Sequence, residues 1–423
     1  MGVVRSCAAV SKAEASSAAM PEIVSESGEE GIDSSFAKKS GFSGGEMQLP
    51  IPARRRVGKV KPTNFLMSNL QDPIKVGAWE LPNRVIMAPL TRCRASEGRI
   101  PNALMADYYS QRSTAGLIIS EATSVEAMGV GYANTPGIWS DEQVEGWKLV
   151  TKAVHDKGGL IILQLWHVGR ISDPMYLDGE LPVAPSAIKP EGHVSHVRPE
   201  KEFVTPRALE LEEIPDIVEA YRKGAENAKK AGFDGVEIHG ANGYLLDQFL
   251  QDSTNKREDQ YGGSIENRAR LMLEVTDAVL SVWDASRVGM HLAPACDAHD
   301  MGDSNPSATF GYVAEELGKR GIAFIFTREA IDDGSVSLEL KKKFGGIYIA
   351  NQGLTAETGA RLVKEGVADA VSYGQLFIAN PDLVKRLKEG APLNEPDPDS
   401  FYSATPKDPK GYVDYPSLED ANV

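Results

Sequence analysis

Hydrogen-bonding and aromatic side chains recur in this sequence where short apolar runs end. Thr91 comes directly after the first such run, Gln164 and Trp166 stand in the third, and His239 and Asn242 lie at the end of the fourth. A histidine at a strand end, taken alone, is more often a structural residue than a ligand. Polar groups that gather at the same end of successive strands instead predict an active site at that end.

The apolar runs predict a (β/α)₈ barrel. They alternate with longer segments of helical periodicity, which is the order of βαβ units in a parallel sheet. Their nearly all-apolar composition fits strands that are covered on both faces. The alternative is an open, doubly wound sheet, but the Gly-x-Gly-x-x-Gly turn typical of that fold does not follow an early strand. The predicted strands are Val85–Leu90, Leu117–Thr123, Leu160–Trp166, Gly235–His239, Val288–Ala293, Ile322–Thr327, Ile347–Ala350 and Ala370–Tyr373.

Helices are expected between these strands. Ser264 is a good N-cap for a helix with apolar residues at helical spacing. The segments Asp141–Lys157 and Leu211–Ala231 show the same periodicity. The proline-rich stretch His167–Arg207 has no long periodic run, and we expect it to pass over the mouth of the active site.

The chain is expected to have three parts: a low-complexity tail over residues 1–61, the barrel over 62–395, and a C-terminal segment over 396–423 that packs on the barrel. The tail has few large apolar residues, so we expect disorder unless a partner protein holds it. Its start matches the N-myristoylation pattern at Gly2, and a palmitoyl chain on Cys7 would complete a membrane anchor. The alternative is an organelle transit peptide, but the first twenty residues hold few basic side chains.

Composition excludes several classes of protein. The net charge of −15 argues against a nucleic-acid partner, which requires a basic face. The three cysteines, Cys7, Cys93 and Cys296, form neither a metal-ligand pattern nor a disulfide framework. We therefore expect no metal and a reducing, cytoplasmic compartment, with membrane association only through lipidation.

An ordered series of motifs carries a resemblance to a known family. They are Pro82–Arg92, Tyr108–Arg112, Ser120–Thr123, Gln164–Arg170, Gly235–Leu250, Gln260–Arg268, Phe377–Leu383 and Tyr412–Leu418. Together they span about residues 63 to 418 and resemble the old yellow enzymes, most closely the bacterial ene-reductases and plant oxophytodienoate reductases. The resemblance implies FMN at the mouth of the barrel, NAD(P)H as the hydride donor to FMN, and a small activated alkene as the hydride acceptor.

The resemblance also implies roles for matching residues. Tyr244 resembles the acid that protonates the alkene, and His239 and Asn242 resemble the pair of donors that polarises the carbonyl or nitro oxygen of the substrate. Tyr132 and Trp166 resemble walls of the substrate pocket, although they could equally be packing residues. The positions that resemble cofactor contacts are Pro89, Leu90, Thr91, Ala122, Gln164, His291, Gly353, Gly374 and Gln375.

Three departures from the family pattern fall in the cofactor half of the site. His291 stands where the fifth strand usually carries an arginine beside the flavin ring, and Gln375 replaces the arginine that clamps the phosphate. Gln352 puts a long side chain where small residues usually let backbone N–H groups approach the phosphate. Since a phosphate favours a bidentate guanidinium, these changes put FMN binding in question and leave two hypotheses. The first is a working flavin oxidoreductase with His291 protonated. The second is a flavin-free pseudoenzyme with a structural or interaction role.

Overall fold

The computed structural model describes residues 68–331, 335–403 and 405–420. The tail over residues 1–61, and with it the predicted acylation of Gly2 and Cys7, lies outside the described residues. Among the helices of these described residues, none is long and apolar enough to cross a membrane.

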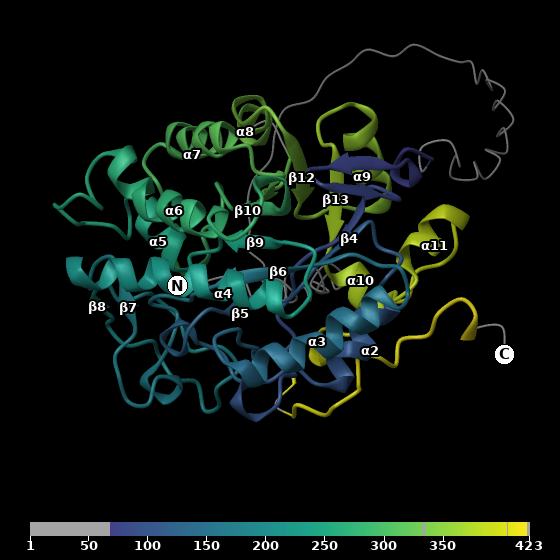
Figure 1. Ribbon diagram of the computed structural model, residues 1–423, viewed down its shortest axis with the longest axis horizontal. Helices are drawn as coiled ribbons and strands as arrows, with labels where there is room; N and C mark the ends of the chain where they lie inside the picture. The colour runs from purple at the N-terminus through teal and green to yellow at the C-terminus, as the bar shows by residue number, and fades with distance from the viewer. Residues whose placement is uncertain (1–67, 332–334, 404, 421–423) are drawn as a thin grey trace, which may run out of the picture. The chain divides into compact units, whose positions relative to one another are not determined.

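Eight parallel strands close into a barrel, which confirms the predicted fold class (Figure 1). Around the ring each strand pairs with the next, and the last pairs with the first. The second predicted strand is divided, because β5 (Thr123–Ser124) follows β4 (Leu117–Ile119) as a separate short strand that also pairs with β6 (Ile161–Trp166). The ring consists of β3 (Val85–Met87), β4 (Leu117–Ile119), β6 (Ile161–Trp166), β9 (Val236–His239), β10 (Val288–Leu292), β11 (Phe324–Arg328), β12 (Ile347–Asn351) and β13 (Ala370–Tyr373).

Helices connect the strands and cover the barrel (Figure 1). The Ser264 side chain accepts a hydrogen bond from the Asn267 backbone N–H, so the predicted N-cap of α6 (Ile265–Leu280) is confirmed. The predicted excursion over residues 167–207 contains a short helix and strand β7 (Val183–Ala184), which pairs with β8 (Arg207–Ala208). The helices are α2 (Ala103–Gln111), α3 (Asp141–His155), α4 (Ile214–Lys230), α5 (Leu245–Leu250), α6 (Ile265–Leu280), α7 (Pro306–Arg320), α8 (Ser337–Phe344), α9 (Ala356–Lys364), α10 (Gln375–Ala379) and α11 (Leu383–Glu389).

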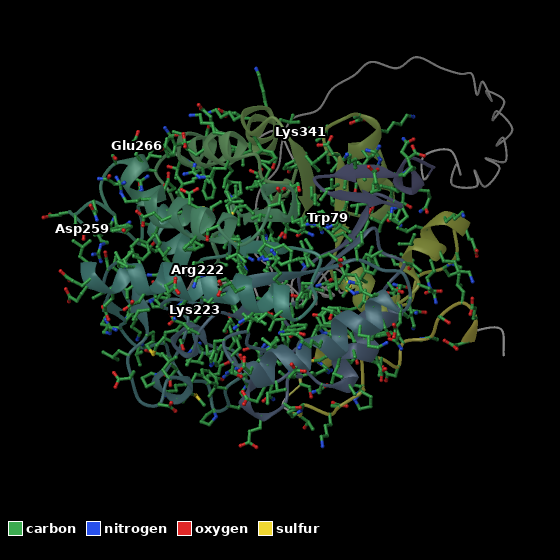
Figure 2. The ribbon with its side chains drawn as sticks, in the orientation of Figure 1. Trp79, Arg222, Lys223, Asp259, Glu266 and Lys341 are labelled. Carbon is green, nitrogen blue, oxygen red and sulfur yellow. The ribbon has the colours of Figure 1, made fainter. Side chains whose placement is uncertain are left out.

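A hairpin that the sequence analysis did not predict packs at the amino end of the barrel. Strands β1 (Ile74–Val76) and β2 (Trp79–Leu81) pair antiparallel, and the Ala78 N–H donates to the Ser286 carbonyl just before β10. Trp79, labelled in Figure 2, is buried against Gly235, where an added Cβ would lie 2.6 Å from its ring. Because the hairpin covers the amino end, the opposite, carboxyl end is the one left for the active site.

Buried arginines tie the C-terminal segment to the barrel. The Arg94 guanidinium donates to the carbonyls of Ser400 at 3.0 Å and Lys410 at 2.9 Å. The ring of Tyr412 stacks on that of Tyr108 with centroids 4.1 Å apart. The hydrogen bonds from Arg94 satisfy backbone carbonyls of an otherwise irregular segment.

Replacing Arg94 with Met should lower the free energy of unfolding by about 2–4 kcal/mol, because several buried carbonyls lose their donor. Urea unfolding followed by tryptophan fluorescence measures the change. The control is Arg222→Met on α4, which removes an arginine that pairs with Glu219 and Glu226 at the surface (Figure 2). The control should have a much smaller effect, and equal effects of the two substitutions would contradict the role given to Arg94.

Candidate active site

Neighbouring strands bring a group of polar side chains together at the carboxyl end of the barrel. Gln164 of β6 lies in register with Glu237 of β9, and His239 of β9 lies in register with His291 of β10. The imidazole rings of His239 and His291 are stacked with centroids 5.0 Å apart. All four side chains are buried. The register of the three neighbouring strands places them in one cluster.

Aromatic side chains adjoin this cluster on one side. The ring of Tyr244 lies 5.0 Å from Trp166 and 5.1 Å from His239, measured between centroids, and is nearly perpendicular to both. The hydroxyls of Tyr244 and Tyr132 are 2.8 Å apart and share a hydrogen bond. The structure therefore brings together the predicted acid, one member of the predicted donor pair and both predicted pocket walls.

Asn242 lies in the turn that follows β9. Its φ of 59° is in the left-handed region, which asparagine tolerates better than most residues. Its side-chain oxygen accepts a hydrogen bond from Arg328 at 3.3 Å, and its backbone carbonyl lies 2.9 Å from Nδ1 of His299. A guanidinium only donates, so the amide oxygen must face Arg328, and the NH₂ group of Asn242 is the donor that it can offer to a ligand.

The histidines of the site are neutral at physiological pH. Burial, helped by the positive charge of Arg328, lowers the pKa of His239 to about 3. Burial first, and then His239 and Arg328, hold the pKa of His291 well below its ordinary value. The expectation that a protonated His291 would replace the missing arginine is therefore wrong. Burial and the nearby positive charge of Arg328 both disfavour the protonated form of the His291 imidazole.

Glu237 is a buried carboxyl group among these residues. The Gln164 side-chain amide donates to it at 2.7 Å, and the same amide nitrogen lies 3.3 Å from Nδ1 of His291. Burial raises the pKa of Glu237 to about 8, and the hydrogen bond from Gln164 only partly opposes this effect. Glu237 is therefore mostly protonated and uncharged near neutral pH.

The raised pKa of Glu237 predicts a pH-dependent stability. Between its ordinary pKa of 4.5 and the raised value of about 8, the folded protein holds a proton that the unfolded chain has lost. The contribution of this carboxyl group is complete below pH 4.5 and declines as pH rises towards 8, by at most about 1.4 kcal/mol per pH unit. In Glu237→Gln this decline should disappear, because glutamine still accepts from Gln164 but does not ionise.

Urea unfolding of both proteins at a series of pH values measures the difference. The unfolding free energy of the glutamine variant, relative to the parent protein, should rise as pH increases from about 5 to 8. Other buried carboxyl groups are common to both proteins and cancel in this comparison. A constant difference across the range would show that Glu237 ionises normally.

The other predicted cofactor positions also lie at the carboxyl end of the barrel. Strands β12, β13 and β3 are neighbours, so the turns that follow them adjoin. Leu90 packs against Gly374, where an added Cβ would lie 3.2 Å from its side chain. Gln352 and Gly353 have φ values of 99° and 63° after β12. The remaining positions are Pro89 and Thr91 after β3, Ala122 between β4 and β5, and Gln375 at the start of α10.

The buried polar atoms of the site fit a flavin ring. Nδ1 of His239, Nε2 of His291 and Oε1 of Glu237 are buried without a hydrogen-bond partner. Buried polar groups are normally satisfied, so partnerless atoms in one cluster indicate a polar ligand. The phosphate side differs from the family pattern: the side chain of Gln352, which was expected to block the phosphate, accepts a hydrogen bond from Arg328 at 2.9 Å.

Three residues of the site were missed in the sequence analysis. Arg328 is the last residue of β11 and comes directly after Thr327, where the predicted strand ended. The rule that identified Thr91 and His239, a polar residue at a strand end, would have found it. Glu237 was hidden by its place inside an apolar strand, and His299 by its irregular loop. Among the described residues, no group of histidine, cysteine and acidic side chains could hold a metal ion.

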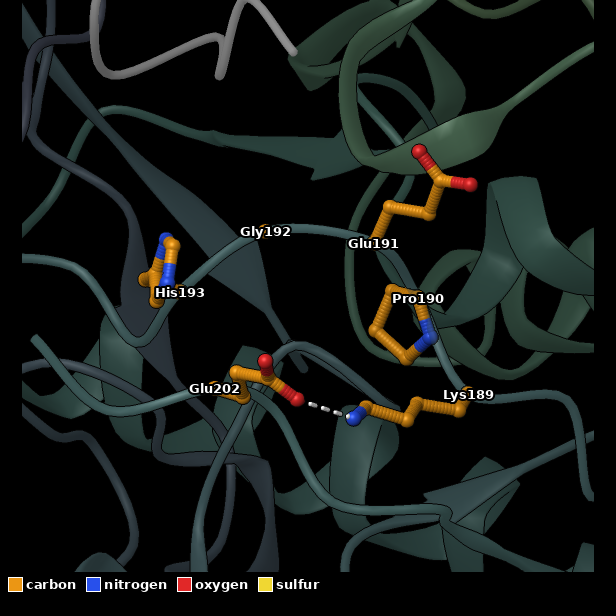
Figure 3. A pocket seen from close by; sticks show the side chains of 6 residues that line it. All are labelled: Lys189, Pro190, Glu191, Gly192, His193 and Glu202. Carbon is orange, nitrogen blue, oxygen red and sulfur yellow. Dashed lines mark hydrogen bonds and ion pairs between the residues drawn. The ribbon is translucent and has the colours of Figure 1, made fainter. Parts of the chain in front are cut away.

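A separate hollow of about 300 Å³ lies in the excursion after β6 (Figure 3). Its lining includes an ion pair of 2.7 Å between Lys189 and Glu202. The predicted site residues are not part of this lining, and an open hollow lined by surface charges has no group suited to redox chemistry. The cluster at the strand ends therefore remains the candidate active site.

A barrel with a polar and aromatic cluster at the carboxyl ends of its strands has the architecture of a TIM-barrel enzyme, and comparison with known proteins identifies the family. The model of the NADH:flavin oxidoreductase / NADH oxidase family matches residues 69–394. The chain therefore belongs to that family, in which FMN is the cofactor and NAD(P)H the hydride donor.

Its relatives are of the old yellow enzyme type. 12-Oxophytodienoate reductase 1 of Oryza sativa subsp. japonica is 45% identical over 366 residues, which cover 83% of this chain and 93% of that protein. 12-Oxophytodienoate reductase 2 of Arabidopsis thaliana is 43% identical, with coverage of 83% and 96%.

Solved structures agree with these relatives. Morphinone reductase in complex with tetrahydroNAD has 48% identity and a TM-score of 0.80, and the match covers 84% of this chain and 99% of that one. The old yellow enzyme homologue from Zymomonas mobilis has 46% identity and a TM-score of 0.80, with coverage of 83% and 100%. These similarities support an NAD(P)H-dependent flavin oxidoreductase and give no support to the flavin-free hypothesis.

Proposed function

We propose that this chain reduces the carbon–carbon double bond of a small activated alkene, such as an enone, with NAD(P)H as the reductant. The observation that carries the proposal is the placement of Tyr244 against His239 and Trp166 at the carboxyl end of the barrel. A proton donor beside a hydrogen-bond donor suits a substrate that gains a proton on carbon while negative charge grows on oxygen. When bound, FMN supplies the hydride transfer between NAD(P)H and the alkene.

His239 and Asn242 would hold the carbonyl or nitro oxygen of the substrate. A lowered pKa keeps His239 neutral, so it donates as a neutral imidazole. Asn242 offers its NH₂ group because its oxygen is held by Arg328. Two donors aimed at one oxygen stabilise the charge that develops there in the transition state.

Tyr244 would deliver the proton to the alkene carbon. Its ring is packed among Trp166, Tyr132, His239 and His299. When the Tyr132 hydroxyl donates to the Tyr244 oxygen, the Tyr244 proton can point to the substrate, and the same bond stabilises the phenolate after transfer.

Steady-state assay of the purified full-length protein with FMN tests the proposal. Anaerobic consumption of NADH or NADPH should depend on an added enone, nitroalkene or maleimide, and the saturated product should accumulate in equal amount. A folded protein that binds no FMN, or one that binds FMN and consumes no NAD(P)H with any of these alkenes, would overturn the proposal.

A further inference from the structure

Arg328 occupies a position between the substrate side and the phosphate side of the site. Its Nε donates to the side chain of Gln352 at 2.9 Å, and its Nη1 donates to the side chain of Asn242 at 3.3 Å. As the last residue of β11, it lies in register with Asn351 at the end of β12. One guanidinium thus contacts the turns that follow two strands, β9 and β12.

The strand register places Arg328 nearer the rim of the barrel than His291. His291 is in register with Phe326 of β11, and its ring lies 4.5 Å from the Phe326 ring. Arg328 follows Phe326 by two residues, so both side chains leave the same face of the strand, and Arg328 lies about 6–7 Å further along it. Along the barrel axis, His291 therefore lies at the height of the flavin-ring side of the site. Arg328 lies nearer the rim, at the height of the turns that follow the strands.

The positions of the two family arginines carry no positive charge in this chain. Gln375 is neutral, and His291 is held neutral by burial. The positive charge of Arg328 acts on all three histidines of the site, because it contributes to the lowered pKa of His239, His291 and His299. A phosphate dianion in this site requires a cationic partner, and a guanidinium can bind it through two parallel hydrogen bonds.

We propose that Arg328 binds the phosphate of FMN in this chain, so that a guanidinium from β11 takes over the charge that the family pattern places on β10 and after β13. The turn after β12 supports the phosphate over the flavin ring as its target. Gln352 and Gly353 belong to that turn, Gly353 has open space around it, and Gln352 accepts a hydrogen bond from Arg328. On FMN binding, the guanidinium exchanges the neutral amide of Gln352 for an anion. The inference rests on the flavin-binding part of the proposed function.

The test compares FMN with riboflavin, which has the same ring system and no phosphate. Affinities of the full-length protein, Arg328→Gln and Arg328→Lys are measured by quenching of flavin fluorescence. Arg328→Gln keeps a hydrogen-bonding side chain without charge, and it should weaken FMN binding roughly 10- to 100-fold and riboflavin binding less than about 3-fold. Arg328→Lys keeps the charge without the bidentate geometry and should lie between the parent protein and the glutamine variant.

Arg320→Met is the matched control, because Arg320 lies on α7 and pairs with Asp277 and Glu316 at the surface. It should leave both affinities unchanged. Unchanged FMN affinity in Arg328→Gln would overturn the inference, as would an equal loss for riboflavin, which would place Arg328 at the ring. Circular dichroism checks folding, and if the glutamine variant does not fold, the lysine variant carries the same comparison. A parent protein that binds no FMN would instead defeat the proposed function and this inference with it.

Discussion

Replacing Tyr244 with Phe should slow the oxidation of the reduced, flavin-bound protein by an enone about 10²–10⁴-fold, which is the range for loss of a general acid. The rate of flavin reduction by NAD(P)H should be unchanged, because that step needs no proton from Tyr244. Phenylalanine fills the same space against Trp166 and His239, so the loss reports on the hydroxyl group. Anaerobic stopped-flow absorbance measures the two half-reactions separately.

Two further tyrosine variants control this prediction. Tyr132→Phe removes the hydrogen-bond partner of Tyr244 and should have a smaller effect, on the order of 10-fold, because the acid itself remains. Tyr221→Phe changes a buried tyrosine of α4 and should leave both half-reactions unchanged. If Tyr244→Phe oxidised as fast as the parent protein, the proton would come from water or another residue.

Replacing His239 with Ala should lower the rate of alkene reduction about 10²–10³-fold, as expected when one donor to a developing oxyanion is removed. His239→Asn, which restores a donor at the same position, should recover part of the loss. Stopped-flow oxidation of the reduced flavin by an enone measures both variants. A control, His155→Ala on α3, removes a histidine that pairs with Asp234 near the surface and should not change the rate.

The pH profile distinguishes a neutral donor from a cationic one. Because the pKa of His239 is lowered to about 3, the imidazole is neutral throughout the range from about pH 5 to 8. The parent protein should therefore show no decline in alkene reduction from ionisation of His239 as pH rises through 6.5, the ordinary pKa of histidine. A decline near pH 6.5 that is absent from His239→Asn would mean that His239 acts as a cation.

Much of the barrel could be predicted because its strands have a simple sequence pattern. A parallel strand buried on both faces reads as a short apolar run, and all eight runs found in the sequence are strands of the ring. The hairpin of β1 and β2 was missed because each of its strands has a charged residue, Lys75 or Glu80, between two apolar ones and so does not form an apolar run. The hairpin is held on the barrel by tertiary contacts of Trp79, and these contacts cannot be seen in the local sequence.

The cluster of the site was partly predictable for the same reason. Residues that end neighbouring strands must lie close together, so the proximity of His239 to Gln164 and His291 follows from strand order. The contact of Arg328 with Asn242 joins residues 86 positions apart and depends on side-chain conformation, which strand order does not specify. The charge of His291 was predicted wrongly because a pKa depends on burial and on neighbours that the sequence alone does not give.

One measurement tests the central claim most directly. The full-length protein is loaded with FMN, freed of unbound flavin, reduced anaerobically with one equivalent of NADPH or NADH, and then mixed with an enone. We expect the visible absorbance of bound flavin to disappear on reduction and return on mixing, with one saturated ketone formed per flavin. A protein whose bound flavin stays reduced in the presence of enone, nitroalkene and maleimide alike would contradict the account.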